Sequence, residues 1–191
     1  MKKWILCAFS ALFLSACMDI KLTSELPAIS YITLQSPKPK PKSCQARQKI
    51  GVLDISARYN DEMNITILDT QSLEVSKVEG KQWITPPKTM LQTMLLQKLE
   101  NACFHTSIQP LGTQKLDKII KISLLSLQVL REGSTQSAQI QILYEIQGLR
   151  NYKSVKSGIL SAKTPLDSMQ NLGKAFSISS DEILEQVLRA L

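Results

Sequence analysis

Residues 138–146 read Ala-Gln-Ile-Gln-Ile-Leu-Tyr-Glu-Ile, and this stretch decides the fold. Ala138, Ile140, Ile142 and Ile146 alternate with polar side chains, a period of two that is typical of a strand with one face buried and one face in water. Turn residues follow at 148–151, and a second run of β-forming residues continues to about residue 162. We therefore predict two adjacent antiparallel strands.

The segment before this strand, residues 116–131, is also predicted to be a strand, with an irregularity. Ile120, Ile122 and Leu124 share one parity, whereas Leu125, Leu127 and Val129 share the other. Because successive side chains of a strand point to opposite faces, this switch of parity predicts either a β-bulge at Leu124-Leu125 or a strand that leaves one packing face for another. Glu132-Gly133-Ser134 then supplies a turn.

Two segments show helical spacing. Pro86 and Pro87 favour the start of a helix, and from residue 88 an apolar stripe includes Leu91, Leu95 and Leu99. Residues 166–191 form the second predicted helix, with a possible N-cap at Ser180 and hence a break near residues 177–180. Its stripe contains Met169, Leu172, Phe176, Ile183, Val187 and Leu191.

Short β-rich runs complete the pattern at 29–34, 50–55, 65–68 and 73–78, the last two separated by polar turn residues and interpreted as a hairpin. Strands and two helices in this order predict an α+β protein: a mostly antiparallel sheet with two helices packed on one face, in a single domain over residues 29–191.

The N-terminus has the pattern of a secretory signal. Lys2 and Lys3 precede an apolar run of 11 residues from Trp4 to Leu14, which is too short to cross a hydrocarbon core of roughly 30 Å. Leu14-Ser15-Ala16-Cys17 resembles the bacterial lipobox. That resemblance implies a signal peptide over residues 1–16, lipidation of Cys17 and a lipidated tether over residues 17–28. Met18 follows Cys17 in place of the aspartate that commonly retains lipoproteins at the inner membrane, so we expect sorting to the outer membrane.

The chain is positively charged, and part of the charge is concentrated in one short segment. The chain has 191 residues and a formal net charge of +7, and three lysines alternate with prolines over residues 37–42. Because proline lacks an N–H and restricts the residue before it, this segment is predicted to be an extended spacer. It either contacts anionic headgroups or is a solvated loop. For a secreted lipoprotein, the positive charge does not indicate nucleic acid binding.

The chain has four cysteines. Cys7 leaves with the signal peptide and Cys17 takes the lipid, which leaves Cys44 and Cys103 as an even pair in an oxidising compartment. We predict that these two form a disulfide, the alternative being two buried, unpaired thiols.

Residues suited to catalysis are scarce. His105 is the only histidine, no carboxylates flank it at a metal-binding spacing, and it is expected to be a helix cap or a surface residue. The glycines are isolated, with no phosphate-binding run and no Gly-x-Ser-x-Gly nucleophile motif. We expect no enzymatic activity, no cofactor and no metal.

A family resemblance joins these features. These features follow one order along the chain: the lipobox, residues 31–34, residues 50–55 with Arg58 and Tyr59, and Trp83 with Pro86 and Pro87 leading into Met90, Leu91, Leu95 and Leu99. The predicted strands at 119–129 and 138–146 and the terminal helix complete the order. In this order the chain resembles the ABC-type transport auxiliary lipoprotein family over most of residues 29–191. The segment 60–77 fits loosely, where that family presents a short arm. The resemblance implies a non-catalytic lipoprotein on the periplasmic face of the outer membrane that docks to a mammalian-cell-entry (MCE) type lipid transporter.

Three functions remain open at this point. The first is the docking component just described, the second is a lipid or lipoprotein carrier or an envelope-assembly lipoprotein, and the third is an enzyme or an inhibitor of one. The expected partners are the membrane, through the lipid anchor, and an MCE-type transporter subunit; homo-oligomer formation stays open.

The candidate partner surface is the water-facing side of residues 138–146. It consists of Gln139, Gln141, Leu143 and Glu145. Amide-rich strands with an isolated leucine suit a contact surface that stays soluble when unoccupied. The alternatives are a solvated sheet face or one covered by the N-terminal strand, and the hairpin within residues 60–79 is the next candidate.

Overall fold

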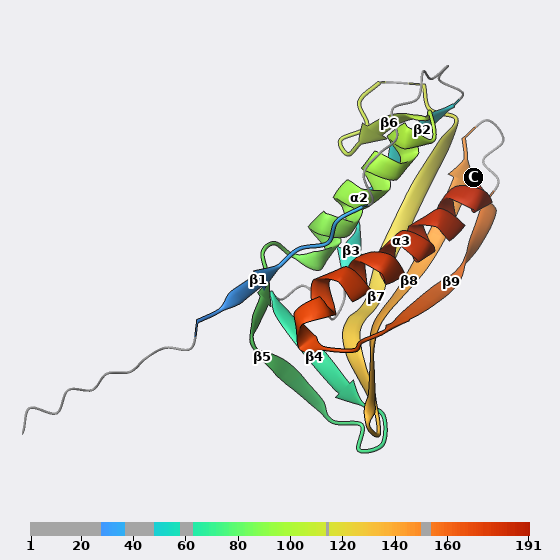
Figure 1. Ribbon diagram of the computed structural model, residues 1–191. Coiled ribbons are helices and arrows are strands. Elements are labelled where there is room, and N and C mark those ends of the chain that lie inside the picture. The colour runs from blue at the N-terminus through green and yellow to red at the C-terminus, as the bar shows by residue number, and fades with distance from the viewer. Residues whose placement is uncertain (1–27, 37–47, 58–62, 114, 150–153) are drawn as a thin grey trace, which may run out of the picture.

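A computed structural model describes residues 28–36, 48–57, 63–113, 115–149 and 154–191 (Figure 1). Its two α-helices are α2 (Pro87–Asn101) and α3 (Leu172–Ala190), the latter preceded by a 3-10 turn, η1 (Met169–Asn171). Its strands are β1 (Ser30–Ile32), β2 (Lys49–Val52), β3 (Ser56–Ala57), β4 (Asn64–Asp69), β5 (Val75–Trp83), β6 (His105–Ile108), β7 (Lys118–Glu132), β8 (Thr135–Gly148) and β9 (Ser154–Pro165).

Strand β7 organises the sheet. On one side it pairs antiparallel with β8, which pairs antiparallel with β9. Along its other side the short strands β2, β3 and β4 follow one another, all parallel to β7. Beyond them, β6 pairs with β2, and β5 and then β1 extend the sheet next to β4.

The prediction of a mostly antiparallel sheet is wrong, because the sheet is mixed. Five strand pairs are parallel (β1–β5, β2–β6, β2–β7, β3–β7 and β4–β7), and three are antiparallel. Local patterns identify strands and tight turns, and the predicted β4–β5 hairpin is confirmed. Parallel pairs join segments separated by long connections, and no local pattern shows which segments meet.

The bulge predicted in β7 is confirmed. The register between β7 and β8 shifts between Leu124 and Ser126. Ile122 before the shift and Leu127 after it are both buried, although their sequence parity differs. The extra residue therefore keeps apolar side chains of this 15-residue strand on the core face along its whole length.

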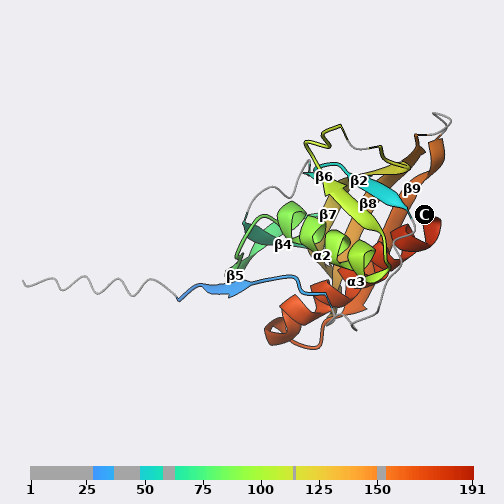
Figure 2. The ribbon, with the colours of Figure 1, turned by 90° about the horizontal axis from the view of Figure 1, so that it is seen from above.

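Both helices lie on the same side of the sheet (Figures 1 and 2). Trp83 at the end of β5 and Phe176 of α3 meet edge to face within this layer, with ring centroids 5.2 Å apart. Both are at most 1% exposed, and they belong to one buried apolar cluster that includes residues of both helices and of β7 and β8.

The break predicted near residues 177–180 is wrong, because α3 is continuous from Leu172 to Ala190. Ser179 lies in the buried face of the helix. Its hydroxyl oxygen lies 3.1 Å from the carbonyl oxygen of Ala138, to which it donates, and 2.7 Å from the hydroxyl oxygen of Thr164. Because the sheet satisfies its hydroxyl, Ser179 is accommodated inside the helix. Ser180, the predicted N-cap, is also buried in the middle of α3 and does not start a helix.

Strands β3 and β6 were not predicted. Residues 105–108 follow α2 directly and carry the exposed His105, so the sequence indicates a surface residue at a helix end and not a strand. They become a strand because β2 offers a parallel edge, on which His105 pairs with Lys49. Among the described residues, no helix is long and apolar enough to cross a membrane.

Candidate functional site

The N-terminal segment, residues 28–36, forms a strap that runs from β1 across the gap between α2 and α3 (Figure 2). Two grooves open on its two sides. The larger, about 880 Å³, lies between the strap and α3, and the smaller, about 480 Å³, lies between the strap and α2. We call these the α3 groove and the α2 groove.

The strap is attached at three points. The carbonyl oxygen of Ile32 accepts the N–H of Ile84 at 2.9 Å, which continues the parallel pairing of β1 with β5. Leu34 is buried, and its N–H donates to the sulfur of Met90 at 3.4 Å. The N–H of Gln35 donates to the hydroxyl of Ser177 at 3.1 Å. The strap therefore bridges the sheet edge and both helices.

Close approach between the strap and α3 depends on Gly173. A Cβ at this position would lie 2.8 Å from the Cγ2 of Ile32, closer than side chains tolerate. Glycine is unfavourable inside a helix, so its presence here follows from packing rather than from helix propensity.

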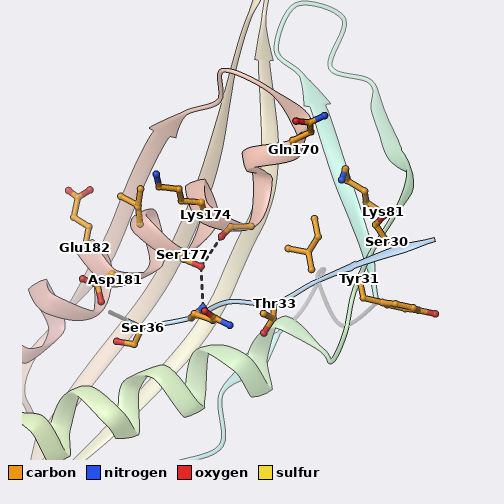
Figure 3. A pocket seen from close by; sticks show the side chains of 14 residues that line it. Ser30, Tyr31, Thr33, Ser36, Lys81, Gln170, Lys174, Ser177, Asp181 and Glu182 are labelled. Atoms are coloured by element: carbon orange, nitrogen blue, oxygen red, sulfur yellow. Dashed lines mark hydrogen bonds between the residues drawn. The ribbon is translucent and has the colours of Figure 1, made fainter. Parts of the chain in front are cut away.

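The α3 groove combines apolar surface with polar side chains and charges of both signs (Figure 3). Lys81 and Lys174 lie toward the Ser30 end and middle of the groove, and Asp181 and Glu182 lie toward the Ser36 end. Lys98 of α2 approaches the carboxylate of Asp181 to 2.8 Å and that of Glu185 to 3.2 Å, which ties the two helices together. The groove therefore offers charged and hydrogen-bonding groups next to apolar surface.

The four residues of the candidate partner surface lie together on one accessible face of the sheet. Gln139, Gln141, Leu143 and Glu145 all lie on the face of β8 that points away from the helices; Leu143 is 42% exposed and the other three are half-buried. The N-terminal strand does not cover this face, because β1 pairs with β5. Gln139 donates to the hydroxyl of Ser161 at 3.5 Å, and Glu145 accepts from Gln147 at 2.8 Å.

Sequence reasoning missed a second apolar residue of this surface. Ile159 of β9 lies directly opposite Leu143 and is 61% exposed. The two form an exposed apolar pair on the outer face of the sheet. The residues of β9 were expected to form a strand, but only the register of β8 with β9 shows that these two side chains are neighbours.

The β4–β5 turn belongs to the second predicted contact region, and hydrogen bonds to one carboxylate close it. The carboxylate of Asp69 accepts the N–H groups of Gln71 at 2.9 Å and Ser72 at 3.1 Å. The hydrogen bond from Ser72, followed by that from Gln71, lowers the pKa of Asp69 below its ordinary value of 3.8. This network holds Leu73 at a φ of 59°, where it is 75% exposed.

The predicted cysteine modifications involve residues outside the described ranges. Cys17, with the signal peptide and the tether to residue 27, lies there, as do the Pro-Lys spacer and Cys44. Cys103 is described: it is half-buried just after α2, with a φ of 68°. Lipidation of Cys17 and the pairing of Cys44 with Cys103 stay predictions. The described residues contain no group of three His, Cys, Asp or Glu side chains arranged to hold a metal ion.

These features define a mixed-sheet α+β protein whose N-terminal segment is strapped between two helices. The fold is similar to that of protein XCC0632 from Xanthomonas campestris, described with the family model DUF330, at a TM-score of 0.69 and 17% identity, covering 84% of this chain and 92% of that one.

Two further solved structures share the fold. The structure of an uncharacterised protein has a TM-score of 0.65 at 13% identity, covering 85% of this chain and 97% of that one. The hypothetical protein CT253 from Chlamydia trachomatis has a TM-score of 0.53 at 11% identity, covering 74% and 96%. At these identities the likeness shows the fold alone. No protein-family model matches this chain, and no curated protein matches it in sequence.

Proposed function

We propose that this chain is a lipoprotein of the cell envelope, anchored through Cys17 on the periplasmic face of the outer membrane, and that it acts as a non-catalytic docking component of an MCE-type ABC lipid transport system. The anchor is supported by the lipobox-like Leu14-Ser15-Ala16-Cys17, and the transport role by the family resemblance of residues 29–191.

The location of the cavities favours docking over lipid carriage. A carrier needs an apolar cavity between helices and sheet, whereas a docking component needs a filled interior and an exposed binding surface. Here Trp83, Phe176 and Leu95 fill that layer at 1% exposure or less. The two grooves instead flank the strap at the surface, and the larger one carries side chains of both charge signs.

The arrangement of attachment and contact surface also fits docking. The strap that continues from the predicted tether packs between the helices. The outer sheet face with Leu143 and Ile159 points away from them. Membrane attachment and partner binding therefore use different sides of the domain, so one does not obstruct the other.

Fractionation tests the anchor. A Cys17→Ser variant of the full chain should leave the membrane fraction, because about 0.8 kcal/mol is lost for each buried CH₂ of the missing acyl chains. A Cys7→Ser variant is the matched control, because Cys7 leaves with the predicted signal peptide, and it should stay membrane-bound. Unchanged sedimentation of Cys17→Ser would contradict the anchor.

Co-purification tests docking. The tagged, membrane-anchored chain should retain an MCE-type subunit after mild detergent extraction. Bound phospholipid quantified in the same preparation separates docking from carriage. Stoichiometric phospholipid without a retained MCE-type subunit would contradict the proposal and support a carrier.

A further inference from the structure

Strand β9 leaves one long edge of the sheet unpaired. Within the described part of the chain it pairs with β8 alone, along 12 residues, and it forms the outer margin of the sheet (Figure 1). The other two edge strands, β1 and β6, have three and four residues. An edge this long is a template for another strand, and proteins usually protect it with charges, prolines or bulges.

The middle of β9 lacks such protection. Residues 157–162 read Ser-Gly-Ile-Leu-Ser-Ala, without a charged side chain or a proline. Lys156 and Lys163 stand at its two ends, and Lys163 is already paired with Glu132 at 2.9 Å. The register irregularity between β8 and β9 lies outside this stretch, between Ile146 and Gln147. Its edge is therefore regular and uncharged.

The backbone direction at this edge follows from one hydrogen bond. The N–H of Leu166 donates to the carbonyl oxygen of Gln136 at 2.9 Å, so Gln136 directs its backbone groups toward β9. Antiparallel partners alternate between bonded and non-bonded pairs, which makes Ile140–Ala162 and Ile142–Leu160 bonded pairs. The odd-numbered residues of β9, including Ile159, consequently direct their N–H and C=O groups to the free edge.

We propose that this edge pairs with β9 of a second copy of the chain, antiparallel about a two-fold axis at Ile159. In this register Ile159 faces Ile159 of the other copy, and Ser157 faces Ser161. Between residues 155 and 163 every outward-directed backbone group then meets another one, because the residues that pair there through these groups are all odd-numbered. The surface is isologous, as a two-fold dimer requires.

Side chains fit the same register. On the outer face it joins the Leu143–Ile159 pair of each copy into one row of four apolar residues. On the helix face Gly158 stands opposite Leu160, a small residue against a large one. Lys156 falls opposite Ala162 and not opposite a lysine, so no like charges meet directly across the new pair.

This inference does not rest on the proposed transport role, and its test is the mass of the full chain extracted in detergent. We expect a dimer, and we expect Ile159→Lys to halve the protein mass while leaving the circular dichroism spectrum unchanged. Ile108→Lys is the matched control: it replaces a comparably exposed isoleucine on a different edge strand, β6, and should leave the dimer intact.

Cross-linking gives an independent readout if the lysine variant fails to fold. Ile159→Cys in the membrane-anchored chain should yield a disulfide-linked dimer on a non-reducing gel, and Ile108→Cys should not. A monomeric wild-type chain, an Ile159→Lys chain with unchanged mass, or equal cross-linking at positions 159 and 108 would each overturn the proposal.

Discussion

Gly173 of α3 and Ile32 of the strap are in such close contact that a Cβ on the glycine would lie 2.8 Å from the Cγ2 of the isoleucine. Two segments separated by most of the chain therefore depend on a missing side chain. The neighbouring hydrogen bond from the Gln35 N–H to Ser177 Oγ requires the same approach, because Ser177 lies one helical turn after Gly173.

Gly173→Ala should destabilise the protein by about 1 kcal/mol, although alanine favours a helix by about 0.8–1.0 kcal/mol over glycine, because the overpacking cost of about 1–3 kcal/mol is larger. In an Ile32→Ala background the same substitution should become stabilising. Denaturant unfolding of the wild type, the two single variants and the double variant gives the four free energies of unfolding that this comparison needs. An equal effect of Gly173→Ala in both backgrounds would show that the strap does not contact Gly173.

Phe176→Ala should cost about 3–5 kcal/mol, because it removes a fully buried ring and its edge-to-face contact with Trp83. Ile178→Ala, two residues along the same helix and 48% exposed, is the control and should change the free energy of unfolding by less than about 1 kcal/mol. Similar losses for the two variants would contradict the assignment of the core face of α3.

Leu143→Asp should weaken retention of the MCE-type subunit while the protein stays folded and keeps its oligomeric mass, since Leu143 is 42% exposed and lies one strand inside the β9 edge. Circular dichroism, hydrodynamic mass and co-purification measure the three properties. Normal retention by a folded Leu143→Asp chain would move the contact to the β4–β5 turn, where Leu73→Asp is the next variant.

Asp69 should contribute stability that depends on pH. Its pKa is lowered in the folded state, so its contribution is complete above the ordinary value of 3.8 and is lost as the pH falls through the lower folded value. Asp69→Asn should therefore be less stable than wild type at pH 7, and the difference should shrink as the pH falls below 3.8. A difference independent of pH would mean that hydrogen bonding alone, and not the charge, stabilises the turn.

If Cys44 and Cys103 form the predicted disulfide, neither should be alkylated in non-reduced protein from the periplasm. Mass spectrometry of a non-reduced digest should then show the two cysteine peptides linked, at their combined mass. Closing a loop of this length stabilises by about 4 kcal/mol in the chain-entropy model, so Cys44→Ser should lower the melting temperature. Two freely alkylated thiols would contradict this prediction.

Elements with a local signal could be predicted from the sequence. The alternation of Ala138 to Ile146 marks β8, the parity switch in β7 marks its bulge, and Pro86-Pro87 marks the start of α2. These patterns reflect burial of one face of one segment, which neighbouring residues encode directly. The placement of Leu143 on the exposed face followed from the same alternation.

Which segments lie side by side could not be predicted from the sequence, because it depends on packing of the whole fold. The parallel pairs of β2, β3 and β4 with β7, the strand at His105, and the approach of Ile32 to Gly173 join residues that are distant along the chain. The pairing of Leu143 with Ile159 likewise depends on register. Backbone pairing is independent of side-chain identity, so many partners satisfy one local pattern, and the choice among them is made by packing of the whole core.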